Sequence, residues 1–273
     1  MCSALTRMPF TAIIMAADRN PDDPVTSAAG VSCKALTPVG GIPMGVRVLN
    51  ALEESLEVGP RLLCGPPGPL LEQAAVLKSG VDAGDYGWTA SRDSPSASAA
   101  AAMEQIPDSQ PVLLTTADHA LLSSQIIDYF CGQARTADFD LMVALAPHEL
   151  VAMAYSGVHR TRLRFSDGDY CSCNLFAFMT PRSRAITGFW RQVESQRKQP
   201  WRVVGILGWW PVFKYLFRRL SLREALARIS DRLEMKIGVV MMPFPEAAVD
   251  VDTENDWRLV EQILAEKEKP RAT

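Results

Sequence analysis

The sequence predicts an α/β fold in which helices cover both faces of a mostly parallel, twisted sheet. Short apolar runs alternate with longer segments whose apolar residues recur every three or four positions, and this alternation is typical of a doubly wound sheet. Clusters of Gly, Pro, Asp and Ser separate the segments, as expected of connecting loops. We expect one domain over residues 1–273, a length that a single domain can reach.

The first half of the chain contains four predicted strands and four predicted helices. The strands are short and apolar and end at turn residues, over 10–17, 61–65, 111–116 and 141–145. A long loop over 18–33 follows the first strand. The helices have apolar residues at helical spacing or start after serines, which are good N-caps, over 46–57, 70–77, 99–105 and 124–133.

The second half departs from this alternation. Residues 161–165 and 170–179 resemble two strands joined by a Ser-Asp-Gly-Asp turn. Residues 181–232 are predicted to be almost entirely helical, 236–242 to form a strand, and 255–266 to form an amphipathic helix. We therefore expect a core of residues 9–180 and 236–268, interrupted by a helical insertion over 181–235.

Composition and charge exclude several classes of protein. Apolar residues make up 48% of the chain and charged residues 22%, the formal net charge is −3 and the pI is about 5.7. We expect no nucleic-acid partner, because such proteins carry a basic face. No apolar run is long enough to span a bilayer. The six cysteines form no Cys-x-x-Cys pair, so we expect a cytoplasmic protein with reduced thiols.

Three segments carry residues suited to chemistry, although the common phosphate-loop and hydrolase motifs are absent. The first is the 18–33 loop with Lys34, where backbone donors and cations could surround phosphates. The second is Asp118, which follows an apolar strand. The third is Asp250 with Asp252, whose two-residue spacing in an extended run turns both carboxylates to one side. The carboxyl edge of an open sheet can gather such aspartates around a hard divalent cation.

Each segment also has an ordinary structural explanation. The loop could be a solvated surface loop, and Asp118 could be a turn or capping residue. Asp252 or Thr253 could cap the last helix, with Asp256 in its first turn. Capping and cation binding are compatible, because each needs only one carboxylate oxygen.

Four motifs, in order, resemble those of the MobA-like NTP transferase domain family, whose members are nucleotidyltransferases on the nucleotide-diphospho-sugar transferase fold. The motifs are Ile13-Ile14-Met15-Ala16-Ala17, Lys34-Ala35-Leu36-x-Pro38-Val39-Gly40-Gly41-x-Pro43-Met44, Leu113-Leu114-x-x-Ala117-Asp118 and Asp250-Val251-Asp252-Thr253-x-x-Asp256. The resemblance implies a Rossmann-like, GT-A-like sheet. It also implies transfer of NMP from an NTP to a phosphorylated small-molecule acceptor, with Mg²⁺ (or Mn²⁺) as cofactor and release of pyrophosphate.

The same resemblance implies a set of site residues. Lys34, Asp118 and Asp252 would be catalytic, and Asn174 would contact the acceptor. The candidate metal ligands are Asp118, Asp250 and Asp252. The candidate nucleotide-binding residues are Ala16, Ala17, Asp18, Arg19, Gly30, Lys34, Ser94, Ser96 and Ser98.

The first loop departs from the family motif. The family's Ala-Ala-Gly-x-Gly-x-Arg is replaced by Ala16-Ala17-Asp18-Arg19-Asn20-Pro21. Asp18 would repel an anion unless its carboxylate turns away or binds a second cation, and Gly30 could supply the close backbone approach instead. Two alternatives stay open, a sugar-nucleotide-dependent glycosyltransferase on a similar fold and a catalytically inactive nucleotide-binding protein.

Residues 201–222 mix Trp, Phe and Tyr with Arg and Lys. A basic, aromatic segment of this kind could lie on a membrane surface as a peripheral contact. It could also form a homodimer interface, cover the acceptor site or pack on the core.

Overall fold

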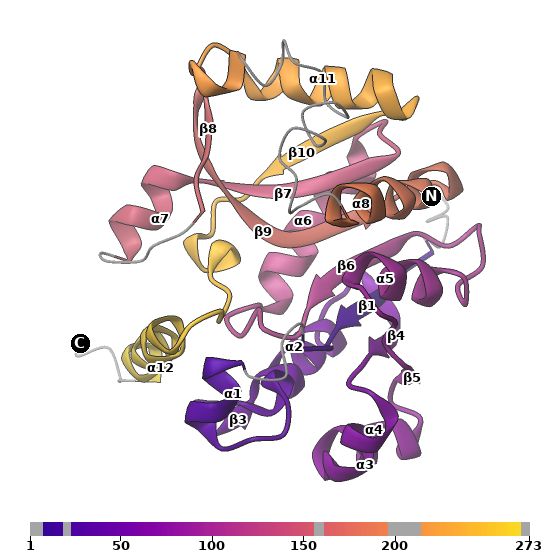
Figure 1. The fold of residues 1–273 in the computed structure, drawn as a ribbon, viewed down its shortest axis with the longest axis vertical. Coiled ribbons are helices and arrows are strands. Elements are labelled where there is room, and N and C mark those ends of the chain that lie inside the picture. Colours follow the sequence, from indigo (N-terminus) through magenta and orange to yellow (C-terminus); the bar gives the residue numbers. More distant parts are fainter. Residues whose placement is uncertain (1–7, 19–22, 156–160, 196–213, 269–273) are drawn as a thin grey trace, which may run out of the picture.

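The computed structural model describes residues 8–18, 23–155, 161–195 and 214–268. Its centre is an eight-stranded sheet with the strand order β10-β7-β9-β6-β1-β4-β5, and β8 pairs with β9 off this path (Figure 1). Strand β9 lies antiparallel between β6 and β7. The other neighbours along the path are parallel. The predicted mostly parallel sheet is therefore confirmed.

The strands match most of the predicted apolar runs. They are β1 (Phe10–Met15), β4 (Val58–Cys64), β5 (Gly87–Thr89), β6 (Val112–Thr116), β7 (Leu141–Pro147), β8 (Leu163–Phe165), β9 (Gly168–Phe178) and β10 (Ile237–Met241). A separate hairpin joins β2 (Pro38–Val39) to β3 (Ile42–Pro43).

The described helices connect these strands or follow them. The α-helices are α1 (Pro24–Ala29), α2 (Met44–Glu53), α3 (Gly68–Gln73), α4 (Ala75–Ala83), α5 (Pro95–Met103), α6 (Ser124–Thr136), α7 (His148–Ala154), α8 (Ile186–Ser195), α11 (Leu222–Leu233) and α12 (Glu254–Glu268). Short 3₁₀ helices are η1 (Lys34–Leu36), η2 (Pro181–Ala185) and η3 (Pro245–Ala248).

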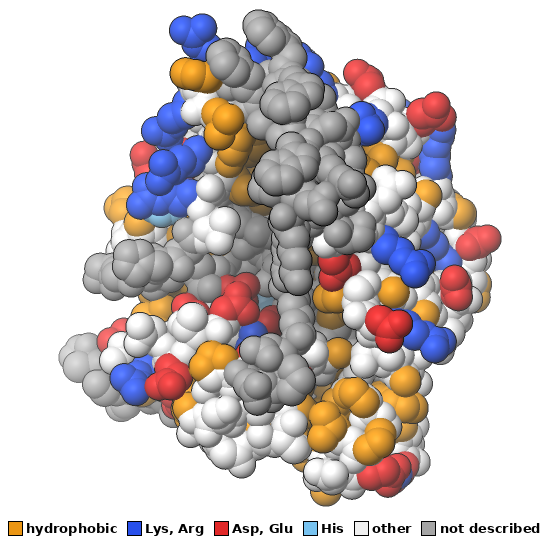
Figure 2. Space-filling view, viewed as in Figure 1, with side chains coloured by type: hydrophobic (Ala, Val, Ile, Leu, Met, Phe, Trp, Pro, Cys, Tyr) orange, Lys and Arg blue, Asp and Glu red, His pale blue; other side chains and the backbone are white. Residues whose placement is uncertain are grey.

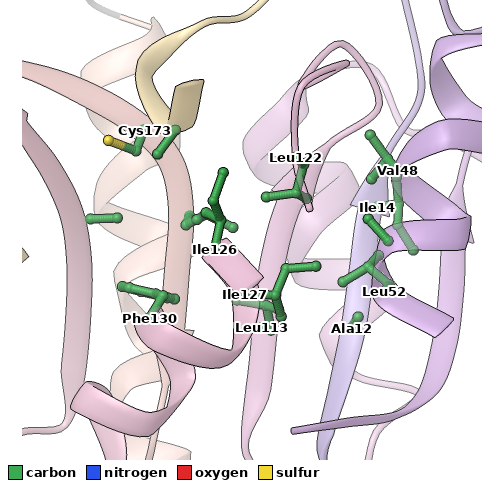
Figure 3. Packing of buried hydrophobic residues seen from close by; sticks show 14 of the residues in the cluster. Ala12, Ile14, Val48, Leu52, Leu113, Leu122, Ile126, Ile127, Phe130 and Cys173 are labelled. Atoms are coloured by element: carbon green, nitrogen blue, oxygen red, sulfur yellow. The ribbon is translucent and has the colours of Figure 1, made fainter. Parts of the chain in front are cut away.

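Alternate residues of the central strands face two separate cores. Ile14 of β1 and Leu113 of β6 pack with residues of α2 and α6 on one face (Figure 3). Ile13 and Leu114 point to the opposite face, which α5, α8 and α11 cover. This alternation follows from the two-residue period of a strand. The helices expected as an insertion thus supply much of the cover of the second face.

Several elements differ from the sequence-based expectations. The predicted 18–33 loop contains α1, because Asp23 caps a helix whose first residue is Pro24. The predicted helix over 70–77 is two helices, α3 and α4, that meet at the non-helical Ala74. Strand β5 and helix α7 were not predicted, since each is too short to show a clear period.

The C-terminal helix returns to the N-terminal part of the chain. Helix α12 lies beside α1 (Figure 1) and also contacts β2. The Trp257 indole donates a 2.7 Å hydrogen bond to the backbone oxygen of Pro38, and Glu261 accepts one from the Gly40 N–H. The segment between β10 and α12 is thereby held over the carboxyl edge of the sheet.

Candidate active site

The site is built where parallel strands end at one edge of the sheet. Asp18 follows β1 and Asp118 follows β6, and these two strands are direct neighbours. The backbone N–H of Val251 donates to the backbone oxygen of Asp118 at 3.1 Å. That bond brings Asp252, which is far away in sequence, to the same edge.

The Lys34 ammonium joins the two predicted catalytic carboxylates. Its Nζ lies 2.8 Å from Asp118 Oδ2 and 2.9 Å from Asp252 Oδ1. The Lys34 side chain is 14% exposed and that of Asp118 is 21% exposed, whereas that of Asp252 is 63% exposed. The three residues expected to be catalytic therefore form one cluster, buried on one side and open to solvent on the other.

Charge pairing outweighs burial in this cluster. Burial alone would raise the pKa of Asp118, but the neighbouring Lys34 ammonium holds that pKa below its usual value. Burial would likewise lower the pKa of Lys34, yet the Asp118 and Asp252 carboxylates raise it. The contact between Lys34 and Asp118 is thus an ion pair that favours the charged form of each residue.

The carboxylate of Asp18 turns toward the protein's own backbone. Both of its oxygens lie about 3 Å from the backbone nitrogen of Lys34, at 3.1 and 3.0 Å. Burial raises the pKa of Asp18, and the hydrogen bond from Lys34 offsets this in part. Asp18 therefore orients the lysine segment. Arg19, the neighbouring candidate, lies outside the described residues.

Thr253, and not Asp252, caps the last helix. The Thr253 hydroxyl accepts from the Asp256 N–H at 3.2 Å, and Asp256 Oδ2 accepts from the Thr253 N–H at 2.9 Å. This reciprocal pair is a capping box. The Asp252 carboxylate remains available to Lys34.

Asp250 and Asn174 form a second polar pair beside the cluster. Asn174 Nδ2 donates to Asp250 Oδ2 at 2.9 Å. Asn174 has a φ of 48°, which is unusual within a strand. The β7–β9 register shifts there, since Val143 opposes Phe176 but Leu145 opposes Ser172. This irregularity of β9 aims the predicted acceptor residue at Asp250, so that Asp250 contacts Asn174 while Asp252 contacts Lys34.

A cavity of about 250 Å³ adjoins the cluster. Its lining includes Ala17, Asp18, Asp118, Ser94 and Ser98 among the predicted residues. Ser94 caps α5. Ser98 is buried and donates to the Ser94 backbone oxygen at 2.8 Å. These serines thus shape the N-terminal end of α5 beside the cavity.

The sequence analysis missed several lining residues, namely Arg92, Asp93, Pro95, Thr116 and Glu194. Thr116 ends β6, and Glu194 reaches the cavity from α8. Glu194 accepts a hydrogen bond from the hydroxyl of Ser96, a predicted nucleotide-binding residue. No motif marked Glu194, because its position depends on how α8 packs against α5.

Two glycines adopt a positive φ, one at the end of α1 and one at the end of β4. Gly30 ends α1 in a left-handed conformation and is not among the described residues that line the cavity. Gly65, at the end of β4, lies close to the backbone that follows β1. An added Cβ there would lie 2.9 Å from the backbone nitrogen of Ala17. Ala16 is buried and donates its N–H to the backbone oxygen of Cys64.

The donor set fits a hard divalent cation. Among the described residues, no three His, Cys, Asp or Glu side chains are grouped to hold a metal ion. Asp118 Oδ1 is nevertheless buried without a hydrogen-bond partner in the described part of the chain, and the neighbouring Asp252 carboxylate is largely exposed. Mg²⁺ typically binds through one or two carboxylates together with waters and substrate phosphates.

Comparisons with known proteins agree with this fold. A hypothetical transferase from Thermus thermophilus is similar over 92% of this chain and 100% of its own, with a TM-score of 0.75 and 26% identity. A 4-diphosphocytidyl-2C-methyl-D-erythritol synthase from Anaerococcus prevotii shares the fold at a TM-score of 0.57 and 12% identity, over 94% of this chain and 96% of its own. A CMP:2-keto-3-deoxy-manno-octonic acid synthetase complexed with CTP shares the fold at a TM-score of 0.59 and 12% identity. The similarity covers 95% of this chain and 99% of that one. No curated protein sequence matches this chain.

Residues 12–235 match the family model of the MobA-like NTP transferase domain. The family match makes this chain a nucleotidyltransferase. The chain belongs to this family, as its four motifs predicted.

The remaining expectations concern partners and location. Within the described ranges, no helix is both long and apolar enough to cross a membrane. The described cysteines are buried thiols, at positions 33, 64, 131, 171 and 173. Of the segment 201–222, residues 201–213 lie outside the described residues. In the remainder, Tyr215 packs against Phe165 of β8 at a ring-centroid distance of 5.6 Å, so part of the segment covers the sheet region. Membrane contact, homodimer formation and cytoplasmic location stay predictions.

Proposed function

We propose that this nucleotidyltransferase moves NMP from an NTP to a phosphorylated small-molecule acceptor and depends on Mg²⁺ or Mn²⁺. The proposal is carried by the contact of Lys34 with two carboxylates. Its Nζ atom lies 2.8 Å from Asp118 and 2.9 Å from Asp252. A cation and two carboxylates at the carboxyl edge of such a sheet suit the binding of a metal-associated phosphate chain.

The reaction requires no protein nucleophile. A phosphate oxygen of the acceptor attacks the α-phosphorus of the NTP and forms a new P–O bond. The bond between the α-phosphorus and the α,β-bridging oxygen breaks, and pyrophosphate leaves with that electron pair. Lys34 would neutralise phosphate charge, while Asp18 holds the Lys34 backbone in place. Catalysis then rests on positioning and electrostatics.

Asp118 and Asp252 would hold the divalent cation, with Asp250 as an alternate. When bound, the cation would act as a Lewis acid on phosphate oxygens and would neutralise the charge that develops on the leaving group. The unpartnered Asp118 Oδ1 supports this assignment.

The acceptor would bind on the β7 and β9 side of the cluster. Asn174 lies there, paired with Asp250. A cavity of about 800 Å³ lies near the carboxyl ends of β7 and β10. Arg162 and Arg218 line it beside the carboxylate of Asp169, and Glu149 and Asp167 line it as well. Lys and Arg side chains gather over β8 at the upper left of Figure 2. The two arginines offer paired N–H donors of the kind that bind a phosphate group on an acceptor.

Pyrophosphate release tests the proposal. The enzyme would be incubated with Mg²⁺, each of the four NTPs and a pool of phosphate and sugar-phosphate acceptors. We expect release with at least one NTP, and a loss of about 100-fold or more in Asp118→Asn, because several kcal/mol of charge stabilisation are removed. Asp82→Asn, in an exposed ion pair with Lys78, is the control and should retain activity.

Two outcomes would contradict the proposal. Undiminished release by Asp118→Asn would remove this residue from the mechanism. Absence of release with every NTP would first be checked by thermal-shift binding of NTP with Mg²⁺. A protein that binds no NTP in that assay is not a nucleotidyltransferase of the proposed kind.

A further inference from the structure

Helix α8 places a carboxylate in the cavity beside the phosphate-binding cluster. Glu194 lies near the end of α8, and its side chain lines the same cavity as Asp118 and Ser94. Helix α8 is held against α5 and the sheet by Trp190, whose ring packs edge-on against Phe176 at 5.3 Å and Phe178 at 6.0 Å. The position of Glu194 is thus set by the core of the protein.

Hydrogen bonds fix one oxygen of Glu194 and leave the other for a ligand. The Ser96 hydroxyl donates to Glu194 Oε2 at 2.6 Å, and the Ser96 N–H lies 3.4 Å from the same oxygen. The Ser94 and Ser96 hydroxyls are 3.0 Å apart. Within the described ranges, no hydrogen bond reaches Glu194 Oε1. An ionised carboxylate has acceptor capacity for several bonds and no donor.

The charge of Glu194 indicates which part of a nucleotide it meets. The Lys34 cluster lies beside Asp118 at one side of the cavity, and that side suits phosphates. The described lining of the cavity also includes Arg92, but the carboxylates of this lining outnumber that cation, with Asp93 and Glu194 on the same side as Ser94. Carboxylates without a bound cation repel phosphates, so the region around Glu194 and Ser94 suits a neutral group. In a nucleotide the base is the neutral group farthest from the phosphates.

We propose that Glu194 selects nucleotides whose base carries an exocyclic amino group. This inference rests on the proposed function, since it requires that an NTP occupy this cavity. Cytosine, adenine and guanine offer an amino donor to a carboxylate oxygen. Uracil presents a carbonyl where cytosine has its amino group, and hypoxanthine lacks the amino groups of adenine and guanine. A carbonyl facing Glu194 would leave two acceptors in contact with no donor, which is unfavourable in a site that excludes water.

Matched nucleotide pairs test this selection by binding alone. Isothermal titration calorimetry with Mg²⁺ would compare CTP with UTP, ATP with ITP, and GTP with ITP. For the base that the protein prefers, we expect the amino member of the pair to bind about 30-fold more tightly or better, because a site built around a polar contact strongly rejects the analogue that lacks it. Glu194→Gln should reduce this ratio at least about tenfold, since an amide can donate to a carbonyl.

Two further variants separate direct contact from general charge. Asp93→Asn removes the same charge from another residue of the cavity lining, so it should change the affinity for both members of a pair alike. Ser96→Ala keeps the carboxylate but removes its anchor, and it should reduce the ratio less than Glu194→Gln does. Thermal unfolding of each variant without nucleotide checks that it is folded.

The outcomes distinguish this inference from the proposed function. If the protein binds an NTP but treats both members of every pair equally, or if Glu194→Gln leaves the ratio unchanged, the inference is overturned and the transferase proposal stands. If the protein binds no NTP at all, the proposed function is overturned and the inference falls with it.

Discussion

Replacing Lys34 by methionine tests the electrostatics of the cluster most directly. The variant keeps an unbranched side chain but removes the ammonium that lies 2.8 Å from Asp118 and 2.9 Å from Asp252. The two carboxylates are then left without their cation. Because Asp118 is mostly buried, its charge becomes costly, whereas Asp252 can turn toward water.

The size of the effect follows from these exposures. Removing one partner of a fully buried ion pair costs about 3–5 kcal/mol, whereas an exposed pair is worth at most about 1 kcal/mol. The Asp118 side chain is 21% exposed and that of Asp252 is 63% exposed, so the contact with Asp118 dominates. We expect Lys34→Met to lower the free energy of unfolding by about 2–3 kcal/mol.

Urea denaturation of Lys34→Met, Asp118→Asn and the double variant measures this effect. The destabilisation by Lys34→Met should shrink by at least about 1 kcal/mol when Asp118 is already neutral, since contacting residues couple. Added Mg²⁺ should also raise the melting temperature of Lys34→Met more than that of the wild type, because the ammonium no longer competes for the carboxylates. Additive single effects, within about 0.5 kcal/mol, would refute this reasoning.

Three other variants probe the surroundings of the site. Gly65→Ala would place a Cβ 2.9 Å from Ala17, so it should weaken NTP binding in calorimetry; unchanged affinity would show that the loop moves freely. Arg184→Met removes hydrogen bonds to four backbone oxygens between residues 103 and 110, and it should cost about 2–4 kcal/mol in urea denaturation; a loss below 1 kcal/mol would contradict this. Burial would raise the pKa of Asp140, but the hydrogen bond from the Lys236 N–H helps to lower it from 3.8. The resulting stabilisation is present above pH 4 and is lost as the pH falls through the lowered pKa. Asp140→Asn should therefore destabilise the protein most at pH 7, and this destabilisation should shrink as the pH falls below 3.8; a loss that does not change with pH would count against it.

The central sheet and the cluster of Lys34, Asp118 and Asp252 were predictable because their signals are local. A buried parallel strand is a short apolar run, and β1, β4, β6 and β7 each show one. The polar residue after such a run lies at the carboxyl edge, which places Asp118. Lys34 and Asp252 were predicted by motif resemblance, and the structure brings both to Asp118.

Other features depend on contacts that no local pattern encodes. Glu194 reaches the cavity only because Trp190 fixes α8 against β9. The positive φ of Asn174 arises where the β7–β9 register shifts, and side-chain periodicity carries no signal for it. Helix α1 was missed because it buries only Val25 and Thr26, so it shows no apolar period.

The backbone hydrogen bond between Val251 and Asp118, together with the contacts of α12, affects the order in which the protein can fold. Every strand of the sheet is complete once Met241 has been translated, yet Asp252 has not then been added. Domains usually begin to fold while synthesis continues. The residues that form the sheet therefore lack one carboxylate of the cluster, and the cluster is completed only when residues beyond β10 return to the N-terminal lysine segment.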